Sequence, residues 1–490
     1  MGGRGERYPP WLPLAALVVL AAALRFSTLT TQSLWFDEAA THAIVHLPFG
    51  EMLRQLPHRE SNPPVFYAIE WVTTRAFGSG AFGLRLLSAV AGTLTVPVGW
   101  AIGRRLGGAR GARTAFAVGA LVAVNPLLVW FSQEARSYGL VVLWSALGLL
   151  FFLRALDDPR ARWIGWWALA SGLALATHYF SAFVLLPQAV WLLWRHPRGR
   201  SVVVAACAGL LALSGALLPL LLAQRGNPYD ISSGSLGVRL AQVAKQFVLG
   251  YHGPLELATG IVAGLLVVGG AWLLLTSVDS VIRQRALGVA AIGLIGIVIP
   301  LLAALGHADY FNTRNLIPAL VPLAAALGVG YGASRRGTTG ALLCAGLCVV
   351  STAIVIAVDV DVRYQRPNWK GLAKALGRSP YTRAIVGANE DPLSIYIPRL
   401  RPMTYTSGAT IQEIDVVTVA SGAGPGDTPE IPPLTGGPTT DFMLVGQVRT
   451  PTYAILRFRR VAPVHVVPGQ VASAYFGSRL PSVDVLPAGG

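Results

Sequence analysis

The most evident shortage in this 490-residue chain is of charge. Only 13% of its residues are charged, whereas 53% are hydrophobic, and the mean hydropathy is +0.55. Soluble domains carry about 25% charged residues, so the composition excludes a purely soluble protein. Cysteine is scarce as well. The three cysteines, Cys207, Cys344 and Cys348, all lie within apolar runs, which argues against a disulfide framework.

Acidic residues are fewer than basic ones, and the formal net charge is +16. A nucleic-acid-binding protein would gather its basic residues on one continuous face. Here they form short clusters between apolar runs, which is the pattern of the positive-inside rule. We therefore expect the basic clusters to meet anionic membrane lipids and expect no nucleic acid among the partners.

Two further features are missing. The sequence has no Gly-rich phosphate-binding loop between its apolar runs, which disfavours a cytoplasmic nucleotide as the substrate. It also has no two matching halves, although many transporters are built from internal repeats. A polytopic transporter or flippase for a lipid-linked sugar stays the alternative reading, and a non-catalytic scaffold that binds a glycan is a second one.

Apolar runs, in contrast, are plentiful. A membrane helix needs about 20 mostly apolar residues. That length predicts about eleven spans, near 11–30, 82–103, 112–131, 138–154, 162–177, 180–195, 201–223, 256–276, 287–306, 315–333 and 339–358. Arginines precede the first span and follow every second span after it, so we expect a cytoplasmic N-terminus. The first span is alternatively a cleaved signal peptide.

The residues after 358 have a different character. "WKGLAKAL" predicts a helix, and "RAIVGA", "LSIYI", "IDVVTV", "DFMLVGQ" and "YAILRF" predict strands. A Gly- and Pro-rich stretch, "SGAGPGDTPEIPPLTGGPTT", predicts a loop between them. The expected fold is thus a polytopic α-helical membrane domain, 1–358, followed by an extracytoplasmic α/β domain, 359–490. Two amphipathic stretches, "FGEMLRQLP" and "LGVRLAQVAKQFVLG", are expected to lie at the membrane interface.

Ionisable and polar residues gather at the predicted outer ends of the spans. Such groups are costly near a bilayer and are functional candidates by default. Asp37 and Glu38, in the first outer loop (31–81), are the candidate catalytic residues. The candidate substrate-binding residues are Arg59, Glu134, Arg136, Tyr138, His178, Tyr179, Tyr310 and Arg314.

An outward cavity of this kind suits a donor that is carried by a lipid, such as a sugar on a polyprenyl phosphate. The phosphate leaving group needs no general acid, but cations stabilise its growing charge. The acceptor hydroxyl does need a base, and Asp37 or Glu38 can serve. One base and one good leaving group predict a single displacement with inversion. The chemistry requires no cofactor, and a divalent cation is possible but not implied.

Several motifs together resemble the membrane-embedded GT-C glycosyltransferases, and more narrowly glycosyltransferase family 39, which includes protein O-mannosyltransferases and aminoarabinose transferases. The resemblance covers about residues 20–375 and is carried by "LWFDEA", "NPPVFY", "LRLLSAVAGTLTVPVGWAIGRRLGG", "NPLLVWFSQEARSYGL", "THYF", "FNTRNLIPALVPLAAAL" and "YQRPNWKGLAKAL". It implies that Asp37 is the catalytic aspartate and that Glu38, Glu134 and Arg136 line the pocket. One departure is Asn62 before Pro63 and Pro64, where family members often have histidine.

Structural roles compete with some of these assignments. Asp37 could cap a helix, Glu134 and Arg136 could form a structural pair, and Asp359 with Asp361 could be a linker rather than a metal site. The expected donor is a mannose- or arabinose-type polyprenyl phosphate, and the acceptor is a hydroxyl of a glycan, lipid or protein. The Gly-, Ala- and Arg-rich composition favours a bacterial cell envelope, with the protein in the plasma membrane and its active site on the extracytoplasmic side.

Overall fold

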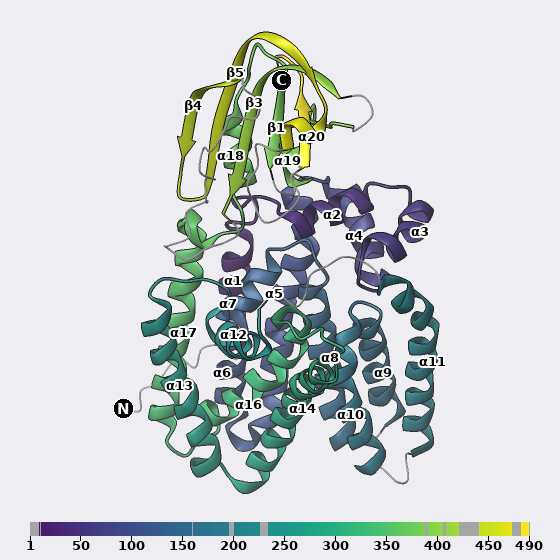
Figure 1. The fold of residues 1–490 in the computed structure, drawn as a ribbon. Helices are drawn as coiled ribbons and strands as arrows, with labels where there is room; N and C mark the ends of the chain where they lie inside the picture. Colours follow the sequence, from purple (N-terminus) through teal and green to yellow (C-terminus); the bar gives the residue numbers. More distant parts are fainter. Residues whose placement is uncertain are drawn as a thin grey trace. The chain divides into compact units, whose positions relative to one another are not determined.

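The computed structural model (Figure 1) describes residues 9, 11–158, 160–195, 200–225, 234–387, 391–404, 408–420, 441–472 and 482–489. The chain forms two compact units. One unit comprises Met1–Leu29 with Ala40–Ile356, and the other comprises Thr30–Ala39 with Ala357–Gly490. The second junction lies near the predicted boundary at 358/359. Unexpectedly, the short segment Thr30–Ala39 groups with the C-terminal residues.

The first unit is helical. Its helices are α1 Leu12–Phe26, α2 Phe36–Val45 (its first turn belongs to the second unit), α3 Phe49–Arg59, α4 Pro64–Phe77, α5 Ala81–Leu106, α6 Gly111–Val124, α7 Pro126–Ser132, α8 Tyr138–Asp157, α9 Ala161–Leu175, α10 Ala182–Arg195, α11 Arg200–Gln224, α12 Leu236–Leu249, α13 Glu256–Ser277, α14 Ser280–Leu305, α15 Thr313–Leu316, α16 Leu320–Gly332 and α17 Gly337–Val360. Both predicted amphipathic stretches are confirmed as helices, α3 and α12.

Each of the predicted spans is helical. The span 112–131 comprises two helices, α6 and α7, and 315–333 comprises α15, a 3-10 turn and α16, while the break at "THYF" separates α9 from α10. Seven helical segments among the described residues are long and apolar enough to cross a bilayer, and an eighth crossing results if the bent pair Gly108–Val124 and Pro126–Ser132 is one span. The count is lower than predicted because α1, α9 and α10 have 15, 15 and 14 residues. The chain is a multi-pass membrane protein.

Close helix contacts in the middle of this unit depend on small residues. Helix α16 packs on α6 at Gly328 and Gly332, where a Cβ atom would lie 2.5 Å from Val118 Cγ2 and 2.4 Å from Thr114 Cα, respectively. Any larger side chain would push the two backbones apart. Helices α8 and α16 are accordingly mostly buried, whereas α11 is almost wholly exposed on the flank of the bundle (Figure 1).

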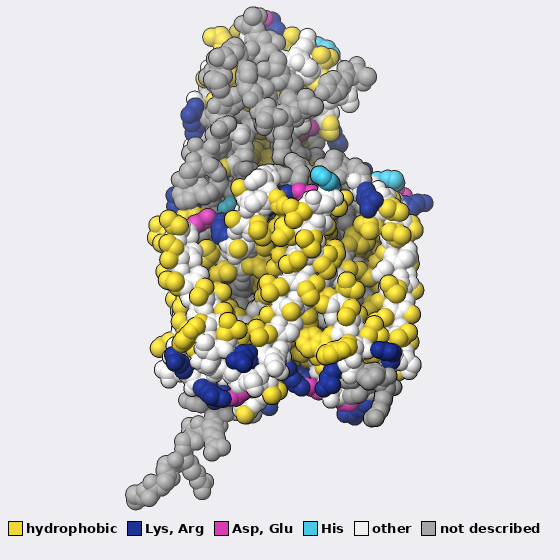
Figure 2. Space-filling model, turned by 60° about the horizontal axis from the view of Figure 1, so that its bottom comes forward, with side chains coloured by type: hydrophobic (Ala, Val, Ile, Leu, Met, Phe, Trp, Pro, Cys, Tyr) yellow, Lys and Arg dark blue, Asp and Glu magenta, His cyan; other side chains and the backbone are white. Residues whose placement is uncertain are grey.

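The predicted cytoplasmic loops meet at one end of the helical unit. Asp157, the last residue of α8, forms ion pairs with Arg105 and Arg285, each at 2.9 Å. Asp279, after α13, pairs with Arg110 at 3.5 Å and with Arg335 at 2.6 Å. Figure 2 shows the Lys and Arg side chains along the lower rim of this unit, below a broad hydrophobic belt. The ion-paired arginines and aspartates at the described ends of α5, α8, α13 and α16 therefore meet on one side of the helical unit, as the alternation predicts.

The second unit is built on one mixed sheet of six strands in the order β2-β6-β1-β3-β5-β4. The strands are β1 Arg383–Gly387, β2 Arg401–Pro402, β3 Ala409–Val419, β4 Met443–Arg449, β5 Tyr453–Val466 and β6 Ser482–Leu486, with helices α18 Trp369–Leu376, α19 Asp391–Tyr396 and α20 Pro468–Ala472. Strands β1 and β3 are parallel, and the other recorded pairings are antiparallel.

One strand prediction in this unit is wrong. "LSIYI" lies in and just after helix α19, because Pro392 stands at its start, where proline favours a helix. Leu393, which is fully buried, packs with the α18 residues Trp369, Leu372 and Leu376. Four other strands and α18 are confirmed, while β2, β6 and α20 were not predicted. The predicted Gly/Pro-rich loop, 421–440, lies outside the described residues.

Candidate active site

The turn between α7 and α8 carries Arg136. Its backbone is fixed twice, since the Arg136 N–H donates to the Glu134 carbonyl at 2.8 Å and the Ser88 hydroxyl donates to the Arg136 carbonyl at 3.1 Å. The side chains of Glu134 and Arg136 are 1% and 4% exposed. A buried charge of this kind is costly unless it has a partner, so its neighbours decide what it can do.

Glu60 is the carboxylate that Arg136 meets. Nη1 of Arg136 donates to both Glu60 carboxylate oxygens, at 3.0 and 2.9 Å, and to the Thr41 hydroxyl at 3.2 Å. The Tyr67 hydroxyl donates to Glu60 Oε2 at 2.5 Å. Glu60 is fully buried at the C-cap of α3. Three helices, α2, α3 and α4, and the turn before α8 thus place these side chains.

His178 lies outside the helices, in the turn between α9 and α10, and is 3% exposed. Its ring contacts Tyr138, with ring centroids 5.8 Å apart. Burial, together with the positive charges of Arg314 and Arg136, lowers the pKa of His178 to about 3. His178 is therefore a neutral imidazole at physiological pH, and the cations of this region are Arg136 and Arg314, on α15.

Tyr179 faces a structural partner. Its hydroxyl donates to Gln224 Oε1 at 2.9 Å, and Gln224 Nε2 donates in turn to the carbonyl of Asn62 at 3.1 Å. Burial raises the pKa of Tyr179 to about 12, so the hydroxyl stays protonated. This chain of hydrogen bonds joins the end of α11 to the segment that begins α4. Asn62, at the departure from the family pattern, contributes its backbone here, and His58 is exposed.

Asp37 and Glu38 stand in the first turn of α2, and both are buried, at 5% and 0% exposure. Helix α2 begins at Phe36, so Asp37 is not the N-cap residue. Glu38 Oε2 accepts the Trp35 N–H at 3.4 Å, which caps the helix. Negative side chains in a first turn are also favoured by the helix dipole.

The segment that leads to these acids is held by the second unit. The Leu34 N–H donates to the Tyr396 hydroxyl at 2.7 Å, and the Lys370 N–H donates to Ser33 Oγ at 3.0 Å. The Arg366 guanidinium donates to Gln32 Oε1 at 3.1 Å. Four consecutive residues before the helix, 32–35, therefore have defined contacts, so the position of Asp37 and Glu38 depends on α18 and α19 as well as on α2.

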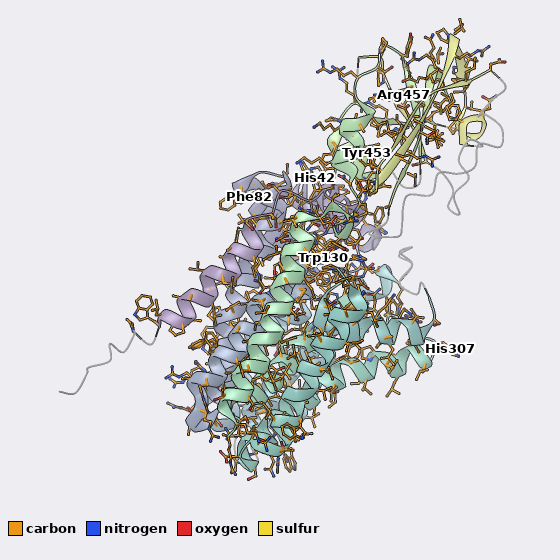
Figure 3. The ribbon with its side chains drawn as sticks, turned by 90° about the vertical axis from the view of Figure 1, so that its left-hand side faces the viewer. His42, Phe82, Trp130, His307, Tyr453 and Arg457 are labelled. Carbon is orange, nitrogen blue, oxygen red and sulfur yellow. The ribbon has the colours of Figure 1, made fainter. Side chains whose placement is uncertain are left out.

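The remaining candidates lie nearer the surface. Arg59 is exposed at the end of α3, and Tyr310 is 40% exposed, with its ring 6.4 Å from that of Phe180. An aromatic group lies beside the Arg136 turn. Trp130 and Phe131, on α7, contact Tyr251 at ring distances of 5.5 and 5.8 Å. Figure 3 labels Trp130 among the helices of the first unit.

Within the part of the chain that the structure describes, no three or more His, Cys, Asp or Glu side chains are arranged to hold a metal ion. Asp361, the second acid of the Asp-Val-Asp motif, instead pairs with Arg363, with Nη2 2.6 Å from Oδ2. The linker reading of that motif fits this contact.

Glu60, Tyr67 and Thr41 are site residues that sequence reasoning missed. The signal available for Glu60 was its place between the candidate Arg59 and the "NPPVFY" motif. Thr41 is four residues after Asp37 in α2, so it lies on the same helix face. No spacing rule pairs an acid at position 60 with an arginine at 136, because that contact depends on how the helices pack.

Residues 61–222 match the family model of dolichyl-phosphate-mannose-protein mannosyltransferases. The undecaprenyl phosphate-alpha-4-amino-4-deoxy-L-arabinose arabinosyl transferase of Pseudomonas aeruginosa is 34% identical over 151 residues, which cover 29% of this chain and 27% of the relative. The enzyme of the same name from Pseudomonas paraeruginosa gives the same values. The aligned region thus spans about a quarter of the length of these relatives.

The fold extends the similarity over nearly the whole chain. ArnT from Cupriavidus metallidurans in the apo state superposes with a TM-score of 0.56 at 16% identity, covering 91% of this chain and 97% of ArnT. The structure of that protein bound to undecaprenyl phosphate gives 0.54 at 15% identity, covering 92% and 98%. The resemblance inferred from the sequence is confirmed at the level of the fold: the chain is a multi-pass membrane protein with an ArnT-like GT-C fold, and its residues 61–222 are similar to the dolichyl-phosphate-mannose-protein mannosyltransferase family.

Proposed function

We propose that this protein is an inverting glycosyltransferase that moves a sugar from a polyprenyl-phosphate donor to a hydroxyl acceptor outside the cytoplasm. The observation that carries the proposal is the buried cluster at the ends of α3, α7 and α9. There Arg136 meets Glu60 and, together with Arg314, acts electrostatically on the neutral His178. The solved ArnT that shares this fold is bound to undecaprenyl phosphate, and guanidinium groups are suited to hold a phosphate of this kind.

In the proposed reaction, the oxygen of the acceptor hydroxyl bonds to the anomeric carbon while the bond from that carbon to the phosphate oxygen breaks. The electron pair leaves with the phosphate, whose charge Arg136 and Arg314 stabilise. The hydroxyl proton passes to the Asp37 carboxylate. Glu38 and Glu134 assist by holding substrate hydroxyls, and Glu60 fixes the Arg136 guanidinium. No divalent cation is needed for this step.

The cluster also supports the proposed topology. The basic loops after α5, α8, α13 and α16 meet at one end of the helical unit, whereas the residues of the cluster come from the loops of opposite phase. We propose eleven crossings, with α1, α9 and α10 among them, and an N-terminus in the cytoplasm of a bacterial cell. Under this topology, residues 1–358 form the catalytic membrane domain in the plasma membrane, and residues 359–490 form an extracytoplasmic domain.

The proposal is tested by sugar release from purified protein in nanodiscs. Polyprenyl-phosphate mannose, 4-amino-4-deoxyarabinose and glucose are offered in turn, with crude envelope extract as the source of acceptor. The expected result is turnover of one donor and a loss of about a hundredfold or more in Asp37→Asn, as for removal of a general base. The matched control is Glu51→Gln, an acid of α3 that pairs with Arg54 at the surface, which should retain full activity.

Two outcomes would contradict the proposal at different points. Equal turnover by Asp37→Asn and the wild type would leave the transferase standing and remove Asp37 as the base. No turnover of any donor in the presence of extract would favour the transporter reading. Movement of a labelled donor across the bilayer of proteoliposomes would then identify it.

A further inference from the structure

Arg25 is a buried cation that the proposed reaction does not use. It lies near the end of α1 and is 0% exposed. Its guanidinium donates to Ser132 Oγ at 3.1 Å and to the carbonyls of Ala21, Ala123 and Val122 at 3.2, 2.8 and 3.2 Å. Among the described residues, no carboxylate neutralises it.

One of these carbonyls, that of Val122, lacks its helical donor because of one proline. In an α-helix the carbonyl of residue 122 accepts the N–H of residue 126, but residue 126 is proline and has no N–H. Helices α6 and α7 meet there at a bend of 55°. Arg25 supplies donors to Val122 and Ala123 at the bend, so at Val122 it replaces a hydrogen bond that the helix has lost.

The same guanidinium also holds the other end of α7. Ser132, which accepts from Arg25, is the last residue of that helix and donates to the Leu128 carbonyl. The next residue, Gln133, donates from Nε2 to the Leu24 carbonyl at 3.0 Å and to Thr28 Oγ1 at 2.9 Å. The end of α1 therefore fixes both residues from which the Glu134–Arg136 turn departs.

Helix α5 leaves room for this arrangement at Gly92. A Cβ atom there would lie 1.9 Å from Ser132 Oγ and 3.0 Å from Arg25 Nε. Any side chain at position 92 would therefore displace the hydroxyl or the guanidinium. The contact is thus built from three elements, α1, α5 and α7, and each contributes a specific feature.

We infer that Arg25 is a positioning residue for Arg136: by anchoring the bend and the end of α7, it sets where the Arg136 guanidinium meets the donor phosphate. This inference rests on the proposed function for its substrate, but the positioning itself is a property of the fold. This positioning requires the planar guanidinium of arginine, which presents several N–H donors in a fixed geometry. Lysine keeps the charge but cannot reach a hydroxyl and three carbonyls with one ammonium group.

The experiment compares Arg25→Lys, Arg25→Met, Ser132→Ala and Gly92→Ala for the affinity of purified protein for undecaprenyl phosphate in nanodiscs. Arg25→Lys and Gly92→Ala should each weaken binding about tenfold, and Ser132→Ala less. The matched control is Gln188→Met, which removes the buried hydrogen bond from Trp167 Nε1 to Gln188 Oε1 away from this turn. It should lower the melting temperature and leave the affinity unchanged.

A merely structural role is separated from positioning by the combination with Arg136→Lys. If Arg25 acts through Arg136, Arg25→Lys should cause almost no further loss of lipid affinity in the Arg136→Lys background. Wild-type affinity in Arg25→Lys, or losses that add fully in the double variant, would overturn the inference, and so would an equal loss of affinity in Gln188→Met.

The proposed function and this inference fail separately. If the wild type does not bind undecaprenyl phosphate, the proposed donor is wrong, and the inference is decided by thermal unfolding alone. Arg25→Lys and Glu60→Gln would then show melting-temperature losses that sum to more than the loss in the double variant if the turn is shared. Losses that add would overturn the inference.

Discussion

Arg136 and Arg383 are both buried arginines that meet carboxylates, yet their settings differ. Arg383 is on strand β1, where Nη1 lies 3.0 Å from Asp415 Oδ2 and 2.8 Å from the Leu376 carbonyl. Arg457, on β5, reaches the same carboxylate, with Nε 2.7 Å from Oδ1. Figure 3 labels Arg457 on the sheet of the second unit. Every member of this group sits on a regular element, in register with its neighbours.

Arg136, in contrast, sits on a turn, and so does its neighbour His178, while Glu60 caps a helix end. Turns positioned by a rigid scaffold are where binding and catalytic groups concentrate. A buried ion pair alone is weak evidence for function or for stability. Both arginines form buried ion pairs, so the pair itself does not distinguish a functional arginine from a structural one. The difference is that Arg136 lies on a turn and Arg383 on a strand, and the predictions below test whether that difference matters.

The largest expected effect is on transfer in Arg136→Lys. Lysine retains a charge but cannot hold Glu60 and Thr41 while it meets a phosphate, so we expect activity to fall by about a hundredfold. Initial rates with saturating donor measure it. Arg459→Lys, which alters the ion pair to Glu413 at 2.9 Å in the sheet, is the matched control and should keep full activity. Equal losses of transfer activity in Arg136→Lys and Arg459→Lys would contradict a specific role for Arg136 in the reaction.

The second prediction is a loss of stability without a loss of transfer activity. Asp415→Asn leaves Arg383 and Arg457 with a weaker partner in a buried layer, which should destabilise the sheet by about 3 kcal/mol. Amide hydrogens of β1 and β3 should then exchange about a hundredfold faster, since each factor of ten corresponds to about 1.4 kcal/mol. Transfer per folded molecule should not change. Unchanged exchange would show that the layer contributes no net stability, and lost transfer would give the sheet a role in the reaction.

Features that depend on neighbouring residues could be predicted from the sequence, whereas contacts between residues far apart in the chain could not. The lengths of the apolar runs predicted the membrane helices, and the alternation of arginine clusters predicted which loops lie on the same side. Both patterns are imposed by the bilayer. "LSIYI" misled because a short apolar run fits either a strand or a helix. The hydrogen bonds from Arg136 to Glu60 and from the Leu34 N–H to the Tyr396 hydroxyl could not be predicted, since they join residues 76 and 362 positions apart in the sequence.

The third prediction concerns pH and His178. Its folded pKa, about 3, is below the unfolded value of about 6.5. Between these two values the unfolded chain binds a proton that the folded protein does not. Stability is therefore fully present above about pH 6.5 and is lost as the pH falls toward 3. The melting temperature should drop between pH 7 and pH 5, and it should drop less in His178→Gln.

The same assignment predicts which substitutions at this position are tolerated. A neutral amide keeps hydrogen-bonding capacity, so His178→Gln should retain transfer within about tenfold, whereas His178→Lys would place a third cation beside Arg136 and Arg314 and should fold poorly. His58→Gln, on the exposed side of α3, is the control for both readouts. A pH–rate profile that loses a group near pH 6.5 only in His178→Gln would show that His178 titrates in the working enzyme.

The smallest effect is expected for Tyr179→Phe, and it tests whether every polar group near the cluster belongs to the reaction. The Tyr179 hydroxyl donates to Gln224, and losing that bond should cost about 1 kcal/mol of stability while transfer stays within about twofold. If Tyr179→Phe instead lost transfer with an unchanged melting temperature, the hydroxyl would turn from Gln224 to the substrate in the working enzyme. The turn between α9 and α10 would then contribute a substrate contact through Tyr179, and the hydrogen bond to Gln224 would form only in the absence of substrate.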